Sequence, residues 1–195
     1  MKHRHETEIK LTVHNCRQIR RRLADLGFRL VRARHFESNY LFDFPNQRLR
    51  KARCLLRLRF AEGEGLLTFK GAPAGSRDYK IRPEIETTFD DGHPLREILH
   101  NLGLREVFCY EKYRSVYAPR GKRQVKDTPH LLLDETPVGN FLELEGPQRW
   151  IDEMARQLGY SRKDYITESY AALYRQKCLR EGKKPGDMIF PVRES

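Results

Sequence analysis

Two segments far apart in the chain place carboxylates at alternate positions. Glu6, Glu8 and Lys10 alternate with apolar residues near the start of the chain, and Glu143 and Glu145 do so much further along. Side chains of a β-strand point to opposite faces with a period of two, so each segment presents a charged row backed by an apolar row. Carboxylate oxygens are the ligands that hard divalent cations prefer. The two segments therefore predict a site for Mg²⁺ or Mn²⁺.

The same alternation recurs along most of the other predicted strands. For any single strand, ordinary amphipathic structure with its charge in solvent explains the pattern. Repetition in nearly every strand favours an arrangement in which the charged faces meet across a shared interior. Because burying unpaired charge is prohibitive, that interior must contain water, internal ion pairs or a bound ligand. Such a lumen suits a metal-bound polyanion whose phosphate oxygens contact cations. Its predicted lining adds Arg57, Arg59, Lys70, Lys80, Arg82, Lys112 and Arg114, with the acidic Glu84, Glu86 and Asp134.

The elements that would position these residues are mainly strands. Alternation between turn signals predicts eight of them, near residues 4–13, 33–44, 54–61, 65–71, 79–88, 105–118, 129–136 and 139–146. Short glycine-containing connections favour antiparallel neighbours. Helices with one apolar stripe are predicted over 15–26, 94–102, 149–158 and about 167–180. We therefore predict an α+β fold, an eight-stranded antiparallel β-barrel with helices packed outside.

The length, charge, hydropathy and cysteine content of the chain indicate which kind of protein it is. Its 195 residues fit a single domain, predicted over residues 1–182, followed by a loosely ordered C-terminal tail over 183–195. A formal net charge of +11 implies an anionic partner. No apolar run approaches the roughly 18 residues of a membrane span, and the charged N-terminus does not resemble a signal peptide. Four cysteines without a CxxC pair are typical of reduced thiols. We expect a cytoplasmic protein without a membrane partner.

The charged segments also follow the order of a known family. Glu6-x-Glu8-x-Lys10 resembles the ExExK signature of the CYTH superfamily, the triphosphate tunnel metalloenzymes. Later segments resemble further blocks of that family: Asn39-Tyr40-Leu41-Phe42-Asp43, Leu56-Arg57-Leu58-Arg59, Leu67-Thr68-Phe69-Lys70, Glu84-x-Glu86, Lys112-x-Arg114, Asp134 and Glu143-x-Glu145. The resemblance covers roughly residues 5–175. ExExK alone would be a weak signal, but the ordered set is specific.

The resemblance implies roles for these residues in an eight-stranded tunnel that acts on triphosphates with Mg²⁺ or Mn²⁺. Glu6, Glu8, Glu143 and Glu145 would hold metal, supported by Asp134. Phosphate would be bound by Arg57, Arg59, Lys70, Lys112 and Arg114, joined by Arg82. Glu84 and Glu86 would either bind a second metal or pair with arginines of the lumen. Lys10 would bind phosphate or, together with Tyr40, position the attacking water. Whether Arg175 or Lys177 of the last helix enters the tunnel is left open.

Two kinds of enzyme and one kind of binding protein fit these features. Attack by water would make the protein a triphosphatase, whereas attack by the substrate's own 3′-hydroxyl would make it a class IV adenylyl cyclase. Hydrolysis is favoured because no segment indicates a purine pocket, and tripolyphosphate, ATP and thiamine triphosphate are the expected substrates. A non-catalytic polyphosphate or RNA binder is disfavoured, because carboxylates facing a polyanion would weaken its binding. A nucleic-acid partner is not expected, and a homodimer is compatible with the sequence.

Overall fold

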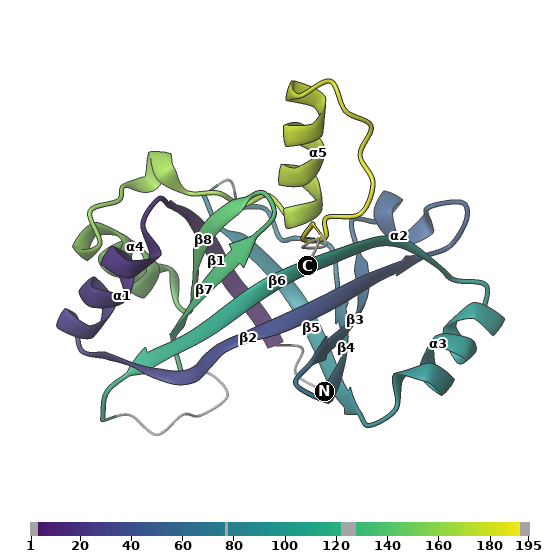
Figure 1. Cartoon of the computed structure of the whole chain (residues 1–195), viewed down its shortest axis with the longest axis horizontal. Helices are drawn as coiled ribbons and strands as arrows, with labels where there is room; N and C mark the ends of the chain where they lie inside the picture. The colour runs from purple at the N-terminus through teal and green to yellow at the C-terminus, as the bar shows by residue number, and fades with distance from the viewer. Residues whose placement is uncertain (1–3, 77, 122–127, 192–195) are drawn as a thin grey trace.

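The strands of the protein close into a barrel. The computed structural model describes residues 4–76, 78–121 and 128–191. Within them, eight strands lie in the order β1-β5-β4-β3-β2-β6-β7-β8, and β8 pairs back onto β1 (Figure 1). All neighbours are antiparallel, which confirms the predicted α+β barrel. The strands are β1 (Arg4–Val13), β2 (Phe28–Asp43), β3 (Leu55–Ala61), β4 (Glu64–Lys70), β5 (Lys80–Phe89), β6 (Arg105–Pro119), β7 (His130–Thr136) and β8 (Gly139–Glu145).

The helices begin and end close to the predicted boundaries. Asn15, Asp91 and Ser169 each cap a helix N-terminus by accepting a backbone hydrogen bond through the side chain, as residues of these types commonly do. Two short elements and the first part of β2 were not predicted. The extra residues of β2 pair with the end of β6, from Phe28 opposite Pro119 onward. The helices are α1 (Cys16–Asp25), α2 (Arg48–Lys51), α3 (Gly92–Asn101), α4 (Gln148–Gln157), the 3₁₀ helix η1 (Arg162–Asp164) and α5 (Tyr170–Arg180).

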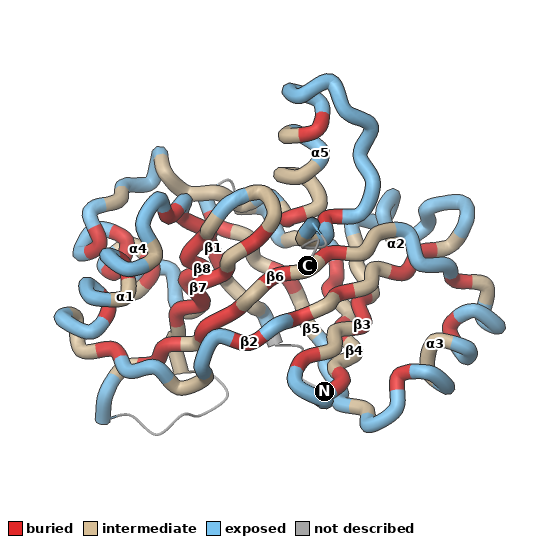
Figure 2. The backbone as a smooth tube through the Cα atoms, viewed as in Figure 1, coloured by how far each residue is buried: buried red, intermediate tan, exposed pale blue. Residues whose placement is uncertain are grey.

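Apolar side chains on the outer faces of the strands pack beneath the helices. The largest cluster joins α1 and α4 to β1, β7 and β8, and includes Leu23, Ile151 and Leu142. These two helices lie side by side, where Arg22 donates to the carbonyl oxygen of Leu158 at 2.8 Å. A second cluster packs α3 against β2 and β3. The buried positions follow the strands while the outer surfaces of the helices are exposed (Figure 2), so apolar packing lies outside the barrel and leaves its interior to polar groups. None of the helices in the described part of the chain is long and apolar enough to cross a membrane.

The C-terminal segment differs from its predicted loose order. Met188 is fully buried, and its backbone N–H and C=O bond to Cys109 and Glu111 of β6 at 2.9 Å each. The side chain of Asp187 accepts from the backbone of Cys109 at 2.7 Å. The segment therefore leaves α5 and returns to the barrel wall (Figure 1). Residues 192–195 of the predicted tail lie outside the described residues.

Acid should weaken the packing of α4 through Asp152. This carboxylate accepts from Tyr79 at 2.5 Å, Tyr165 at 2.9 Å and Arg162 at 2.5 Å. Burial acts to raise the pKa of Asp152, but these hydrogen bonds outweigh it and lower the pKa below the usual 3.8. A depressed pKa contributes stability that is present above the unfolded value and is lost as pH falls towards the folded value.

We therefore expect Asp152→Asn to cost about 1–2 kcal/mol of stability near pH 6, and less as pH falls below about 4. Urea unfolding of both proteins across this pH range measures the effect. If the free energies of unfolding of the two proteins differed by the same amount at every pH, the stabilising role given to the Asp152 carboxylate would be wrong.

Candidate functional site

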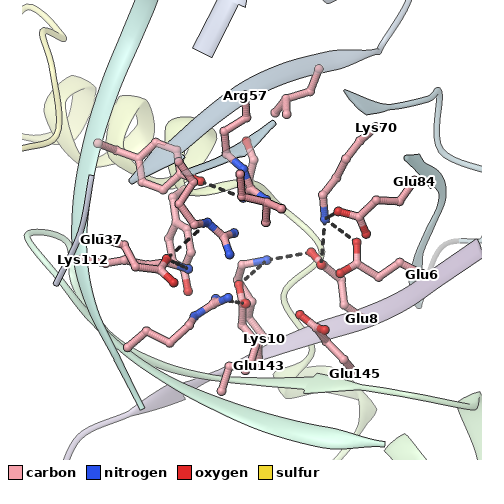
Figure 3. Close-up of a pocket in the computed structure, with 18 of the residues that line it drawn as sticks. Glu6, Glu8, Lys10, Glu37, Arg57, Lys70, Glu84, Lys112, Glu143 and Glu145 are labelled. Carbon is pink, nitrogen blue, oxygen red and sulfur yellow. Dashed lines mark hydrogen bonds and ion pairs between the residues drawn. The ribbon is translucent and has the colours of Figure 1, made fainter. Parts of the chain in front are cut away.

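A cavity of about 310 Å³ runs through the barrel interior, lined by alternate residues of the strands (Figure 3). It is strongly charged because most apolar residues of the same strands face outward, although Leu41, Leu55, Leu66, Val116 and Leu132 also line it. The structure places along it every residue of the predicted site except Tyr40 and Asp134. The lining includes Glu6, Glu8, Lys10, Arg57, Arg59, Lys70, Arg82, Glu84, Glu86, Lys112, Arg114, Glu143 and Glu145.

Three carboxylates meet on one side of this tunnel. Glu8 of β1 lies opposite Glu145 of β8 in the strand register, and Glu6 is two residues away on the same face of β1. One oxygen of each lies within 4.8 Å of the others. Burial, followed by the charge of Glu8, raises the pKa of Glu6 to about 7. The donor set is all oxygen and the crowded negative charge favours a cation, so the group fits Mg²⁺ or Mn²⁺.

Three lysine ammonium groups contact this acidic group in the described structure, and one of them, from Lys10 of β1, donates to Glu8 at 3.1 Å. Lys70 of β4 donates to Glu6 and lies 3.2 Å from Glu84. Lys80 of β5 donates to Glu8 at 2.5 Å. The side chains of Lys70, Glu6 and Glu84 converge on one another (Figure 3). The carboxylates therefore have lysine counter-ions within the tunnel.

Glu143 lies among cations in this structure, and its predicted metal binding stays a prediction. It lies opposite Lys10 in the β1–β8 register, and its carboxylate contacts Lys10 at 3.3 Å and Arg114 at 2.5 Å. Burial acts to raise the pKa of Glu143, but these two cations hold it well below the usual range. Glu143 is thus an ion-pair partner, and it is not one of the three clustered carboxylates.

Asp134 also has cations as its partners here, and its predicted support of a metal stays a prediction. It is fully buried, on the same face of β7 as His130 and Leu132, which line the tunnel. Its oxygens accept from Lys112 at 2.8 Å, from Arg114 at 2.6 and 2.7 Å, and from the hydroxyl of Tyr170 at 2.8 Å. Two N–H groups of an arginine guanidinium can donate to the two oxygens of one carboxylate, and this pair of hydrogen bonds fixes the orientation of the guanidinium. Asp134 therefore positions the two cations.

Glu37 of β2 is a buried carboxylate that the sequence did not single out. It lies 3.4 Å from Lys112 and 3.6 Å from Arg59. Burial acts to raise its pKa, but the charges of Lys112 and Arg114 lower it well below the usual range. The signal was available, because His35, Glu37 and Asn39 alternate with Phe36, Ser38 and Tyr40 on β2.

The basic wall retains unused hydrogen-bond donors. Arg57 donates to Thr68 at 3.1 Å and to the hydroxyl of Tyr110 at 3.3 Å, whereas its Nε is buried without a partner in the described structure. The amide nitrogen of Asn39 is also buried and unpartnered there. Buried donors are normally satisfied, so each group has room for an ordered water as its acceptor, and Arg57, which lines the tunnel, could instead donate to a bound ligand. A phosphate oxygen has that chemistry.

Arg82 and the two glutamates of β5 have partners within the protein. Arg82 donates to the carbonyl oxygens of Gly71, at 2.8 Å, and of Arg53. Glu86 accepts from Thr68 at 3.0 Å and lies 3.9 Å from Arg57. Glu84 contacts Lys70, so both glutamates of β5 have partners here, and the alternatives of ion pairing and a second metal site stay predictions.

The suggested pair of Lys10 and Tyr40 does not come together. The Tyr40 ring lies on the outer face of β2, with the Arg96 guanidinium 4.3 Å from its centroid. Burial acts to lower the pKa of Lys10, but the charges of Glu8 and Glu143 outweigh it and raise the pKa above the usual range. Lys10 is thus paired with Glu8 and Glu143 in this structure, and its role in binding phosphate or positioning water stays a prediction.

Helix α5 contributes its first turn to the tunnel. Ser169, Tyr170 and Ala171 line the cavity, whereas Lys177 donates to the carbonyl oxygen of Pro137 at 3.2 Å and Arg175 lines a different cavity. Neither basic residue is part of the tunnel lining. His130 of β7 was also missed by sequence reasoning, and it lies 2.8 Å from Glu145. A lone histidine at a strand start carries no sequence signal for that contact.

A closed antiparallel barrel with carboxylates facing cations in its interior defines a tunnel-type β-barrel protein. A family model described as the CYTH domain matches residues 4–170. The chain therefore belongs to the CYTH domain family, and the resemblance seen in its motifs is confirmed.

Individual relatives agree with this assignment. The "putative adenylate cyclase" of Methanocaldococcus jannaschii is 28% identical over 178 residues, covering 86% of this chain and 97% of the relative. The structure of a "putative adenylate cyclase" from Vibrio parahaemolyticus has a TM-score of 0.75 at 21% identity, covering 88% of this chain and 98% of that one. A "putative adenylyl cyclase" from Hippeastrum, described as having a dominant triphosphatase activity, has a TM-score of 0.57 at 19% identity, covering 92% and 97%. The two structural likenesses show a shared fold.

Proposed function

We propose that the protein is a divalent-metal-dependent enzyme that hydrolyses tripolyphosphate or an organic triphosphate. The observation that carries this proposal is the division of one tunnel into a group of three carboxylates and a wall of cations with unused buried donors. Carboxylates suit the metal, and guanidinium and ammonium groups suit the phosphate chain. Membership of a family whose members act on triphosphates supports the same conclusion.

In this mechanism the chain itself binds and orients the phosphates. Arg57, Arg59, Lys112 and Arg114 would neutralise phosphate oxygens, while Asp134 and Glu37 hold the cations in place. Neutralising these oxygens lowers the barrier to in-line displacement at phosphorus. Glu6, Glu8 and Glu145 would hold Mg²⁺ or Mn²⁺, which supplies charge stabilisation and a more acidic bound water. Lys10 would contribute positive charge beside Glu8 and Glu143.

Class IV adenylyl cyclase activity is the second candidate, favoured by the name of the Methanocaldococcus jannaschii relative. Product analysis with tripolyphosphate and with ATP, in Mg²⁺ or Mn²⁺, separates the two enzymes. Orthophosphate from tripolyphosphate without cyclic AMP from ATP supports the triphosphatase. Cyclic AMP and pyrophosphate from ATP would establish the cyclase. Turnover of neither would lead to thiamine triphosphate as the next substrate, and binding without any metal requirement would indicate a simple polyanion binder.

Arg57→Ala should weaken triphosphate binding by about 10–100-fold, because hydrogen bonds to charged groups contribute about 1.5–3 kcal/mol each. The measurement is the KM for tripolyphosphate, together with its dissociation constant. Arg21→Ala is the control, since Arg21 is exposed on α1 outside the barrel. Equal effects of the two substitutions would mean that binding depends on diffuse surface charge.

A further inference from the structure

A second cavity, of about 780 Å³, adjoins the tunnel. We call it the mouth cavity; it lies between the β2–β3 connection, α5 and residues 184–186 of the C-terminal segment. The two cavities border each other, because their linings share Leu41, Leu55, Lys80, Arg82, Ser169 and Ala171. Its volume falls within the roughly 300–1,000 Å³ of small-molecule sites. A phosphate chain in the tunnel would therefore direct its organic group into this space.

The charge of the mouth cavity is not neutralised. Arg53, Arg175 and Lys184 line it, and none of the three has an ion-pair partner among the described residues. The carboxylate in its lining is Asp43, whose oxygens already accept from the backbone N–H groups of Phe44 at 2.7 Å, Leu49 at 2.8 Å and Arg50 at 3.0 Å. This contrasts with the tunnel, where most cations contact a carboxylate. The mouth cavity therefore has unused capacity for negative charge.

One wall of the mouth cavity is apolar. Leu49, Val107, Phe108 and Tyr174 contribute to its lining. Val107 is 55% exposed, and the rings of Phe108 and Tyr174 lie 6.2 Å apart between centroids. Aromatic and aliphatic surface of this kind suits a planar ring. The cavity thus combines an apolar wall with three cations, Arg53, Arg175 and Lys184, that have no ion-pair partner among the described residues.

We propose that the mouth cavity binds the organic group of the substrate, and that this group is an aromatic ring system with a negative charge of its own. A nucleoside triphosphate with an additional phosphate on its sugar has this chemistry. A cationic organic group, such as the thiazolium of thiamine triphosphate, would find no free carboxylate among the described lining residues. This inference rests on the proposed function, because it assumes a triphosphate chain in the tunnel.

Substrate comparison with the full-length protein tests the proposal. The probes are tripolyphosphate, ATP, adenosine 3′-phosphate 5′-triphosphate and thiamine triphosphate. We expect kcat/KM to be highest for the 3′-phosphorylated nucleotide and lowest for thiamine triphosphate among the three organic substrates. Raising the salt concentration should reduce this preference, because exposed charges are screened.

A charge-reversal variant tests the residues themselves. In Arg175→Glu combined with Lys184→Glu, the ratio of kcat/KM for the 3′-phosphorylated nucleotide to that for ATP should fall about tenfold, since each exposed charge contributes at most about 1 kcal/mol. Arg180→Glu is the matched control, because Arg180 is an exposed residue of α5 that does not line the cavity. The control should keep the wild-type ratio.

Three results would overturn the inference: no preference for the extra phosphate, a preference for thiamine triphosphate, or an unchanged ratio in the double variant. Tripolyphosphate separates this failure from failure of the proposed function, since it has no organic group. If no triphosphate is turned over, the proposed function is wrong, and dissociation constants of the same compounds, measured by calorimetry, still test the mouth cavity.

Discussion

Replacing Glu145 by Gln should abolish metal-dependent turnover while leaving the barrel folded. Glu145 shares the acidic group with Glu6 and Glu8, and the substitution keeps its shape but removes its charge. Loss of a partner that merely orients a metal ligand already costs about 10–100-fold in metal affinity or activity, and we expect loss of the ligand to exceed about 100-fold. The measurement is the rate of tripolyphosphate hydrolysis as a function of Mn²⁺ and Mg²⁺ concentration.

Glu135→Gln provides the matched control for this experiment. Glu135 is a carboxylate of neighbouring β7 whose partners, Arg20 and Arg34, lie outside the tunnel. Its replacement should leave the metal dependence unchanged. If Glu145→Gln retains both the rate and the metal concentration required for half-maximal activity, the acidic group is not the metal site.

Asp134→Ala should destabilise the protein by about 3–5 kcal/mol, because removing one partner of a buried ionic network leaves the others unpaired. Lys112 and Arg114 would lose their shared carboxylate, and the Tyr170 hydroxyl would lose its acceptor. The free energy of unfolding in urea measures the effect. Asp25→Asn, at an exposed position near the end of α1, should have almost no effect.

The same variant distinguishes positioning from metal binding. If Asp134 acts through Lys112 and Arg114, the variant protein that remains folded should show a raised KM for triphosphate with little change in the metal requirement. A selective loss of metal affinity, with unchanged stability, would return Asp134 to the metal site.

The barrel could be predicted from the sequence because the alternation of polar and apolar residues within each strand shows which side chains face inward and which face outward. The alternation of Glu6, Glu8 and Lys10 holds whatever their neighbours are, and the confirmed fold follows from repeating that pattern. Which charged residues become neighbours inside the barrel depends instead on the strand order and register, which the alternation does not specify. Lys10 lies opposite Glu143, and Glu8 lies opposite Glu145. The register of β1 and β8 therefore pairs Glu143 with a cation and Glu145 with another carboxylate.

Two other differences have the same physical origin. Tyr40 falls on the even-numbered, outward side of a motif whose odd-numbered residues Asn39 and Leu41 face inward, so proximity along the chain to charged residues did not bring it into the tunnel. The C-terminal segment carries a charged, glycine-containing composition typical of loose structure, yet Met188 finds a pocket against β6. Long-range contacts of this kind leave no periodic trace in the sequence.

In the proposed enzyme, the lysine counter-ions of the acidic group would make metal binding and phosphate binding thermodynamically coupled. Lys70 and Lys80 contact Glu6 and Glu8, the same carboxylates that would hold a divalent cation. Occupation of those carboxylates would release two ammonium groups into the lumen, where a phosphate chain could bind them. Linkage requires the reverse effect to have the same size, so a bound triphosphate would raise the affinity for the metal by an equal factor. The free protein would then bind the metal and the triphosphate together more tightly than it binds either ligand alone.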